Sequence, residues 1–199
     1  MRSEKGTVEI YDGYPKVTAQ VSKGISGLFD GDFDFTRVGA KFYYQVERLN
    51  KSTTEFLIEG KMAFGEVPLT HLFHAYPNAP TKETIMQRFS VAGVNSFETM
   101  YFGEFFSDRI ATLQIKHHLR PFNLGEKFKP EMVFITRYAI GDISNIARHQ
   151  DVSFGTLDKG YTETGFEINK ILFGFGTSLT YRYGCLLYTS PSPRDGLLS

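Results

Sequence analysis

The sequence predicts an all-β fold, specifically an incomplete transmembrane antiparallel β-barrel with about eight strands of a larger barrel. Three observations lead to this prediction. Aromatic residues make up 15% of the 199 residues, and aromatic side chains favour strands. Several segments alternate polar and apolar residues with period two. No apolar run approaches the roughly 18 residues that a membrane helix needs.

The clearest alternation covers residues 37–47 and 55–64, which the polar connector 48–53 joins. In both segments the even positions are mainly apolar and the odd positions mainly polar. We therefore expect an antiparallel hairpin with one apolar face. In some registers Lys41 and Glu59 form an opposite-charge pair on the polar face.

Further segments have strand-like patterns, and together with the hairpin they make about eight strands. They are residues 15–23, 97–106, 108–118, 130–140, 161–168 and 175–183.

The connections between the predicted strands differ greatly in length. The long ones are residues 65–95, 120–129 and 141–160. A membrane barrel has long loops at one end and short turns at the other, but these lengths do not alternate cleanly. Either 65–95 contains another strand or one periplasmic connection is unusually long, and the sequence does not assign which end faces outward.

Composition excludes some functions. Lys+Arg and Asp+Glu are both 22, so the formal net charge is zero. Proteins that bind phosphate backbones usually carry a basic excess, so we expect no nucleic-acid partner. The only cysteine, Cys185, cannot form a disulfide within the chain. Residues 1–6 lack the apolar region of a signal peptide, which we interpret as a start inside a longer gene.

The last residues, 185–199, do not continue the preceding pattern. Alternation stops at Gly184, and Pro191 and Pro193 cannot continue a central strand. Most of this segment also resembles the translation of a sequencing-library adapter. We therefore divide the chain into a β-barrel fragment, residues 1–184, and an artefactual tail, residues 185–199.

Several short segments, in their order and spacing, resemble one known family. They are Tyr14-Pro15, Lys23-Gly24-Ile25, Gly31-Asp32-Phe33-Asp34, Gly65-Glu66-Val67-Pro68, Glu104-Phe105-Phe106-Ser107-Asp108-Arg109, His117-His118, residues 160–169 and Tyr181-Arg182-Tyr183-Gly184. The chain resembles the C-terminal barrel of a Gram-negative outer-membrane family whose full-length members begin with a carboxypeptidase-regulatory-like domain. That barrel is similar to the bacterial surface antigen superfamily, which assembles or translocates outer-membrane proteins. The resemblance spans roughly Tyr14 to Gly184.

The resemblance implies a place in the bacterial outer membrane, with outer-membrane lipid and other envelope proteins as partners. It implies a role in outer-membrane protein assembly, translocation or transport. It also implies a larger barrel, because the upstream soluble domain, earlier strands and the final strand are missing from this chain. The family supplies no catalytic residues. We predict that the protein is not an enzyme and has no catalytic, cofactor-binding or metal-binding residues, and hence no cofactor.

The histidines are candidates for a metal site, which needs ligands that converge at fixed spacing. His117 and His118 are adjacent in a predicted strand, so they point to opposite faces and cannot bind one ion. His71 and His74 lie in a proline-containing loop without nearby cysteine or acidic residues. We expect all of these to be interfacial or loop histidines.

Charged residues on one predicted strand face are candidates for acid–base chemistry. They are Lys41, Glu47, Glu55, Glu59 and Lys61. Paired carboxylates can act as acid and base when one pKa is raised, but such charges more often line the wet interior of a barrel. We favour this second interpretation.

Two loop motifs are weaker candidates. Asp30, Asp32 and Asp34 carry oxygen ligands suited to Ca²⁺, but the distant glutamate of an EF-hand is missing, which favours a solvated acidic loop. The segment Gly174-Phe175-Gly176 lacks the third glycine of a nucleotide-binding loop. We expect it to be a turn followed by a crowded strand.

Aromatic residues gather toward predicted strand ends, and this predicts an interfacial girdle around a membrane barrel. The residues are Tyr43, Tyr44, Phe64, Tyr101, Phe102, Tyr138, Tyr181 and Tyr183. In a soluble barrel the same residues would form the core.

Two alternative functions stay open. A soluble lipocalin-like β-barrel would bind a lipophilic ligand and would point its apolar faces inward. A membrane-embedded hydrolase would use the lumenal carboxylates, chiefly Glu55 and Glu59.

Overall fold

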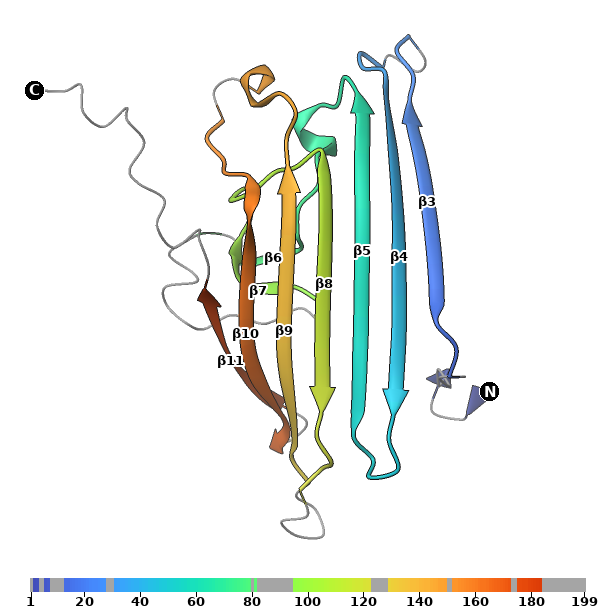
Figure 1. Cartoon of the computed structure of the whole chain (residues 1–199), viewed down its shortest axis with the longest axis vertical. Coiled ribbons are helices and arrows are strands. Elements are labelled where there is room, and N and C mark those ends of the chain that lie inside the picture. The colour runs from blue at the N-terminus through green and yellow to red at the C-terminus, as the bar shows by residue number, and fades with distance from the viewer. Residues whose placement is uncertain are drawn as a thin grey trace, which may run out of the picture.

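The structure is a computed structural model that describes most of the chain before the tail. It describes residues 2–3, 6–7, 13–27, 31–79, 81, 95–122, 129–149, 152–172 and 175–183. The tail at 185–199, Asp30 and Gly174 lie outside the described residues. The chain is an all-β protein, and its long strands form one antiparallel sheet (Figure 1).

The main sheet is a meander of seven strands in the order β11-β10-β9-β8-β5-β4-β3. The strands are β3 (Lys16–Gly24), β4 (Phe35–Glu47), β5 (Thr53–Gly65), β8 (Arg109–His118), β9 (Glu131–Asp142), β10 (Leu157–Leu172) and β11 (Phe175–Tyr183). Each of them contains or overlaps a segment predicted from its alternation. Period-two alternation with many aromatic and β-branched residues is the pattern of a sheet with two different faces.

The remaining elements are short. They are β1 (Arg2–Ser3), which pairs with β2 (Gly6–Thr7); β6 (Pro77–Ala79), which pairs in parallel with β7 (Phe97–Tyr101); and the 3-10 helices η1 (Leu69–His71) and η2 (Ile146–Arg148).

The prediction that residues 97–106 form one of the strands of the main sheet is wrong. Only Phe97–Tyr101 forms a strand, and it pairs with β6 outside the main sheet. Phe97 and Met100 are both buried, although they are separated by an odd number of positions and so do not share one face of a regular strand. The segment packs against the main sheet instead of extending it.

Alternation gives the main sheet one face that carries its charges. Lys41 lies opposite Glu59 in the β4–β5 register, and the predicted ion pair between them is confirmed, with 3.4 Å between Lys41 Nζ and Glu59 Oε1. We call their side of the sheet the polar face. Its charged residues are Lys16, Arg37, Lys41, Glu47, Glu55, Glu59, Lys61, Lys116, Glu131, Arg137, Glu163, Glu167 and Arg182.

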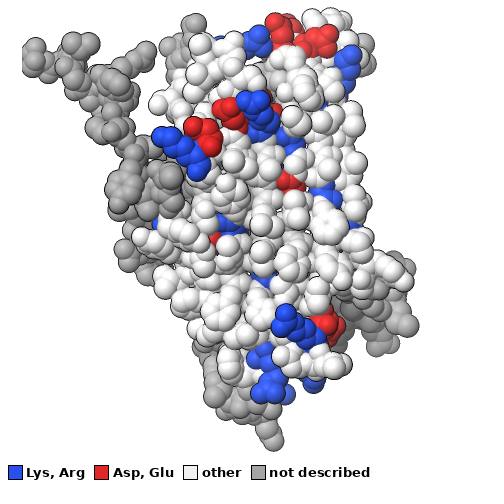
Figure 2. Space-filling model, in the orientation of Figure 1, with Lys and Arg blue, Asp and Glu red and all other residues white. Residues whose placement is uncertain are grey.

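The opposite face, the apolar face, is nearly free of charge. The β4 and β5 residues on this side, from Thr36 to Val46 and from Thr54 to Phe64, include no Asp, Glu, Lys or Arg. Ile58 and Met62 are 47% and 46% exposed. Other exposed apolar side chains here are Val17, Val21, Phe64, Phe134, Tyr138, Ile140, Leu179, Tyr181 and Tyr183. Figure 2 shows a face of the molecule whose charged atoms gather toward its two ends.

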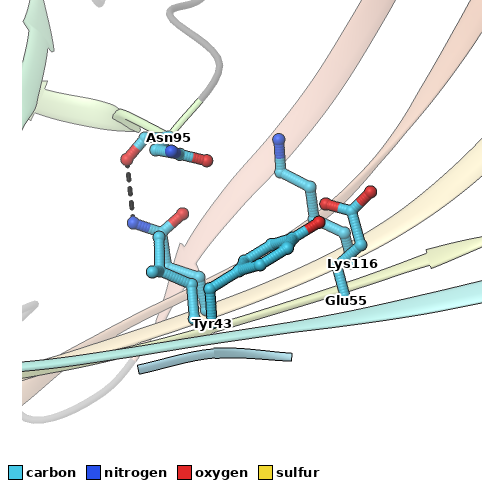
Figure 3. A pocket seen from close by; sticks show the side chains of 6 residues that line it. Tyr43, Glu55, Asn95 and Lys116 are labelled. Atoms are coloured by element: carbon cyan, nitrogen blue, oxygen red, sulfur yellow. Dashed lines mark hydrogen bonds between the residues drawn. The ribbon is translucent and has the colours of Figure 1, made fainter. Parts of the chain in front are cut away.

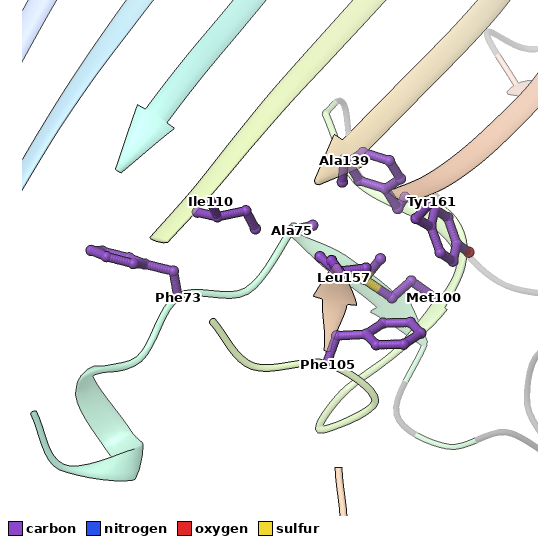
Figure 4. Close-up of a cluster of buried hydrophobic side chains, with 9 residues drawn as sticks. Phe73, Ala75, Met100, Phe105, Ile110, Ala139, Leu157 and Tyr161 are labelled. Carbon is purple, nitrogen blue, oxygen red and sulfur yellow. The ribbon is translucent and has the colours of Figure 1, made fainter. Parts of the chain in front are cut away.

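The connection between β5 and β8 folds back over the polar face. We call its described parts, residues 66–79 and 95–108, the insertion. Buried apolar side chains fill the space between the insertion and the strands (Figure 4). They are Phe73, Ala75, Phe97, Met100 and Phe105 from the insertion and Ile110, Ala139, Leu157 and Tyr161 from the sheet side. The hydrophobic core therefore lies on the polar-face side of the sheet. Burial of these side chains holds the insertion there.

With residues 97–106 outside the main sheet, its two longest connections, 66–108 and 143–156, lie at the same end (Figure 1). The long-loop end, at the top of Figure 1, has connections 25–34, 66–108 and 143–156. The short-turn end has connections 48–52, 119–130 and 173–174. The connection 119–130 still departs from this pattern, because it is longer than the connection 25–34 at the opposite end.

Among the described residues, β3 and β11 each pair with a single neighbour in the main sheet. The all-β class and the antiparallel sheet are therefore confirmed. The described strands form an open sheet, without the closure that a barrel requires.

A tight contact between β10 and β11 yields a test of the observed register. A Cβ at Gly165 would lie 2.8 Å from Thr180 Cα. We predict that Gly165→Ala lowers the free energy of unfolding by about 1–3 kcal/mol, the usual cost of overpacking. Gly60→Ala is the control, since a Cβ at Gly60 meets no atom within 4 Å. Urea titration followed by circular dichroism measures both, and equal losses would contradict the register.

Candidate functional site

A buried ion pair lies on the polar face. Arg137 in β9 and Glu163 in β10 are opposite each other in the register, and Arg137 Nη1 donates to Glu163 Oε1 at 2.7 Å. Both side chains are 0% exposed. Removing charges from water costs several kcal/mol, which close pairing offsets only when further hydrogen bonds satisfy the remaining atoms.

The insertion supplies those further hydrogen bonds to Glu163. The backbone N–H groups of Glu98 and Thr99 donate to the two Glu163 carboxylate oxygens at 3.0 and 3.1 Å, and Thr99 Oγ1 donates at 2.7 Å. Thr99 Oγ1 also lies 2.6 Å from Tyr161 Oη. A carboxylate of the sheet therefore binds the backbone of β7.

Glu98, a residue of the insertion, accepts hydrogen bonds from the sheet. Ser178 Oγ and Thr180 Oγ1, both in β11, donate to Glu98 Oε2 at 2.7 and 2.9 Å. Glu98 Oε1 lies 3.4 Å from Arg137 Nη1. One glutamate of the insertion thus contacts both β9 and β11.

A neighbouring ion pair repeats this pattern. Arg182 Nη1 in β11 donates to Glu104 Oε1 of the insertion at 2.6 Å. The Arg182 guanidinium also lies over the Tyr161 ring, 4.6 Å from its centroid, where a cation is attracted by the face of the ring. The insertion is therefore bound by charge as well as by apolar packing.

A second ionic cluster lies on β4 and β5. Glu59 is 4% exposed, and its carboxylate oxygens lie 3.4 Å from Lys41 Nζ and 3.0 Å from Lys61 Nζ. Tyr76 of the insertion donates to Glu59 Oε2 at 2.7 Å and accepts from Lys61 Nζ at 2.6 Å. Partial burial raises the pKa of the Tyr76 hydroxyl, which keeps it protonated as a donor.

A third ionic cluster lies toward the short-turn end. His118 lies between two carboxylates, with Nε2 3.3 Å from Glu55 Oε1 and Nδ1 3.1 Å from Glu131 Oε1. Lys170 Nζ lies 3.0 Å from Glu131 Oε2. These contacts connect β5, β8, β9 and the end of β10.

A cavity of about 10 Å³ lies beside this cluster, where the insertion meets the sheet (Figure 3). Its lining residues are Tyr43, Glu55, Leu57, Asn95, Gln114 and Lys116. Gln114 Nε2 donates to the Asn95 carbonyl oxygen at 2.8 Å, so the insertion bounds the cavity on one side. This volume is about that of a single water probe, which is far below the roughly 300 Å³ of a small-molecule site.

The carboxylates on the polar face are arranged as a structural network. The charged residues predicted to share one face do share it: Lys41, Glu47, Glu55, Glu59 and Lys61. General acid–base catalysis needs a carboxyl group that can reach a proton of the substrate. Glu59, Glu98 and Glu163 instead receive hydrogen bonds from within the chain.

The candidate metal ligands do not converge in the part of the chain that the structure describes. As predicted, His117 and His118 point to opposite faces, and His117 Nδ1 lies 2.8 Å from Thr54 Oγ1 on the apolar side. His71 and His74 pack against different phenylalanine rings. No group of at least three His, Cys, Asp or Glu residues among the described residues could hold a metal ion.

The two loop motifs show no assembled site in the described residues. Asp32 and Asp34 are exposed in the β3–β4 connection, and Asp30 lies outside the described residues. In the glycine motif, Phe175 begins β11, as predicted for a strand start, and Gly174 lies outside.

The predicted aromatic girdle is wrong for three residues. Tyr43 lies on the polar face, where it lines the cavity, and Tyr101 and Phe102 belong to the insertion. Tyr43 and Tyr44 are neighbours, so strand alternation allows only one of them to face outward. The others lie on the apolar face: Tyr44, Phe64, Tyr138, Tyr181 and Tyr183.

Sequence reasoning missed the residues that hold the insertion. They are Glu98, Glu104, Arg137, Glu163 and Arg182. One signal was available, because Arg137 shares its strand face with Ile135 and Ala139, where a charge requires a partner. The contact of Glu98 with this pair could not be found from local pattern, since Glu98 was assigned to a strand of the main sheet.

Comparisons with protein-family models, with curated proteins and with solved structures find no match to this chain. Within the described residues, no helix is both long enough and apolar enough to cross a membrane.

The buried pair yields a test of how the insertion is held. We predict that Glu163→Ala lowers the free energy of unfolding by about 3–5 kcal/mol, because Arg137 is left buried without its main partner. Amide hydrogen exchange at Glu98 and Thr99 should also become faster. Lys170→Ala is the control, since this exposed pair contributes at most about 1 kcal/mol. Unchanged exchange at both amides would contradict the assigned role of Glu163.

Proposed function

We propose that this chain forms part of the wall of a bacterial outer-membrane β-barrel, with its apolar face against lipid. One observation carries the proposal: across the middle of the main sheet the charges lie on the polar face, whereas the opposite face exposes apolar side chains, and charges of that face such as Lys23, Arg109 and Asp142 lie near the long-loop end. A sheet in water normally does the reverse. Hydrocarbon is the environment that suits an extended apolar surface of this kind.

The height of the apolar face supports the same proposal. On β5 the outward residues from Thr54 to Phe64 carry no charge, and they cover about 34 Å along the strand at ~3.4 Å per residue. At a tilt of about 40°, this is roughly 26 Å along the membrane normal, close to the ~25 Å apolar band of such barrels. Arg109 and Asp142 form an exposed ion pair in register with Met62, near the long-loop end of this band.

The open edges favour a larger barrel. β3 and β11 each have one free edge in the described sheet, and an unpaired backbone group in hydrocarbon costs several kcal/mol. Further strands must therefore pair with both edges in a membrane. In known outer-membrane barrels the longer loops lie outside the cell and the short turns lie in the periplasm. By analogy, the long-loop end of this sheet faces the cell exterior and the short-turn end faces the periplasm.

The role that we propose within the outer membrane is protein assembly, translocation or transport. The family resemblance of residues 14–184 supports this role. In our proposal, the polar face lines the barrel interior, and the insertion occupies the space beside it. Passage of a substrate along this face would require displacement of the insertion from β9, β10 and β11.

No observation favours the lipocalin-like alternative. A soluble binding barrel would turn Ile58, Met62 and Phe134 toward an enclosed cavity, yet these side chains lie on the exposed face. The hydrolase alternative would need Glu55 or Glu59 available to substrate, whereas Glu55 lies against His118 and Glu59 against Lys41 and Lys61.

Neighbouring aromatic residues on opposite faces give a direct test. The chain contains no tryptophan, so Phe42→Trp and Tyr43→Trp each introduce a single reporter, and the two form a matched pair. In reconstituted bilayers we predict that brominated lipid quenches the fluorescence of Phe42→Trp several-fold more than that of Tyr43→Trp. Equal quenching, or a folded chain that stays in solution without detergent, would rule out the membrane assignment.

A charge on the apolar face gives a second test. We predict that Ile58→Arg destabilises the protein in bilayers by about 2–4 kcal/mol, because it places an uncompensated charge near the middle of the apolar band. Thr36→Arg, near the edge of the band, should cost at most about 1 kcal/mol. Urea titration in lipid vesicles compares the two variants, and an equal cost would argue against a bilayer around this face.

A further inference from the structure

The short-turn end carries a group of exposed cations, which we call the cationic rim. Arg48 and Lys51 lie in the β4–β5 turn, Arg120 and Lys129 lie in the β8–β9 connection, and Lys170 lies near the end of β10. All of these side chains are exposed. Within the described part of the chain, only Lys170 of this group has an ion-pair partner. Figure 2 shows Lys and Arg atoms gathered at the lower end of the molecule.

The two ends of the sheet differ in their charge. At the long-loop end, exposed carboxylates accompany the cations: Asp32, Asp34, Glu66 and Asp158. Two cations there form ion pairs, Arg109 with Asp142 and Arg148 with Glu66. Among the described residues of the short-turn end, Glu47 is the exposed carboxylate, and Glu131 is engaged with His118 and Lys170. In the described part of the chain, unpaired positive charge is therefore concentrated at the short-turn end.

Exposed apolar residues stand beside the cations of the rim. Leu49 follows Arg48 in its turn, and Phe122 lies two positions after Arg120; both side chains are exposed. The Phe122 backbone N–H donates to the Pro130 carbonyl oxygen at 2.9 Å, which holds the Phe122 main chain at the base of its connection. Apolar side chains next to Lys and Arg are typical of segments at a membrane interface, where the apolar part enters the acyl layer and the charge remains at the headgroups.

The rim lies at the depth where headgroups would be found. Val46 is the last outward apolar residue of β4, and Arg48 follows two positions later, about 7 Å along the strand. Cations at this distance from hydrocarbon are within reach of lipid phosphates. The rim residues also come from separate connections, an arrangement that suits many mobile lipid anions better than one rigid acidic partner.

We propose that the cationic rim binds the phosphate groups of anionic phospholipids in the leaflet at the short-turn end. The proposal rests on the proposed membrane function, because only an inserted sheet brings the rim to the headgroups. Attraction of this kind raises the local concentration of anionic lipid by up to about fivefold for each Lys or Arg near the surface. It weakens at high ionic strength, since salt screens exposed charges.

Phe122 provides a reporter beside the rim. Phe122→Trp introduces a single tryptophan into the full chain, which is reconstituted in phosphatidylcholine bilayers with either brominated phosphatidylglycerol or brominated phosphatidylcholine. We expect several-fold stronger quenching by the anionic lipid at equal mole fraction. Substituting Arg48, Lys51, Arg120 and Lys129 together by glutamine should bring the two lipids to equal quenching.

Controls separate this inference from the proposed function. Arg148→Gln with Lys159→Gln removes cations from the long-loop end and should leave the lipid preference at Phe122→Trp unchanged. Equal quenching by both lipids, with the rim intact and with Phe42→Trp strongly quenched, would overturn the rim proposal while the membrane wall stands. A lipid preference that survives the fourfold glutamine variant would also overturn it. If neither reporter is quenched, the membrane proposal itself fails.

Discussion

Segregation of charge to one face of the main sheet is the constraint on which the rest of this structure depends. Because side chains alternate across a strand, each strand presents its two sets of side chains to different environments. The polar face must satisfy charges such as Arg137 and Glu163 with partners. The apolar face must lie against a medium in which exposing a side chain such as Ile58 carries no free-energy cost. One sheet therefore requires two opposite surroundings.

The insertion satisfies the first of these requirements. Its Glu98 carboxylate and its β7 backbone hydrogen-bond to side chains of β9, β10 and β11, and Tyr76 contacts Glu59 and Lys61 on β5. Buried ion pairs contribute little net stability compared with apolar packing, but they are costly to break and they specify geometry. The same contacts that position the insertion therefore also resist its displacement, which bears on the transport role that we propose.

The second requirement connects the apolar face to both ends of the sheet. If hydrocarbon covers that face, then the residues just beyond it lie among headgroups. Their charges can then interact with lipid phosphates, which would not be present around a soluble protein. The long-loop end has mixed and paired charges, whereas the cationic rim at the short-turn end is largely unpaired among the described residues. The apolar face, the insertion and the cationic rim all fit the single orientation in a bilayer that we propose.

The sequence by itself determined the strands with clean period-two patterns, the hairpin at residues 37–64, the Lys41–Glu59 pair and the opposite directions of His117 and His118. These follow from local alternation, which is a property of the backbone of each strand. Only the tertiary structure decided that residues 97–106 lie outside the main sheet, that Tyr43 faces the cavity, and that Glu163 binds the insertion. Such contacts join positions far apart in the chain, so their partners depend on how the connection folds back, and no local pattern encodes that path.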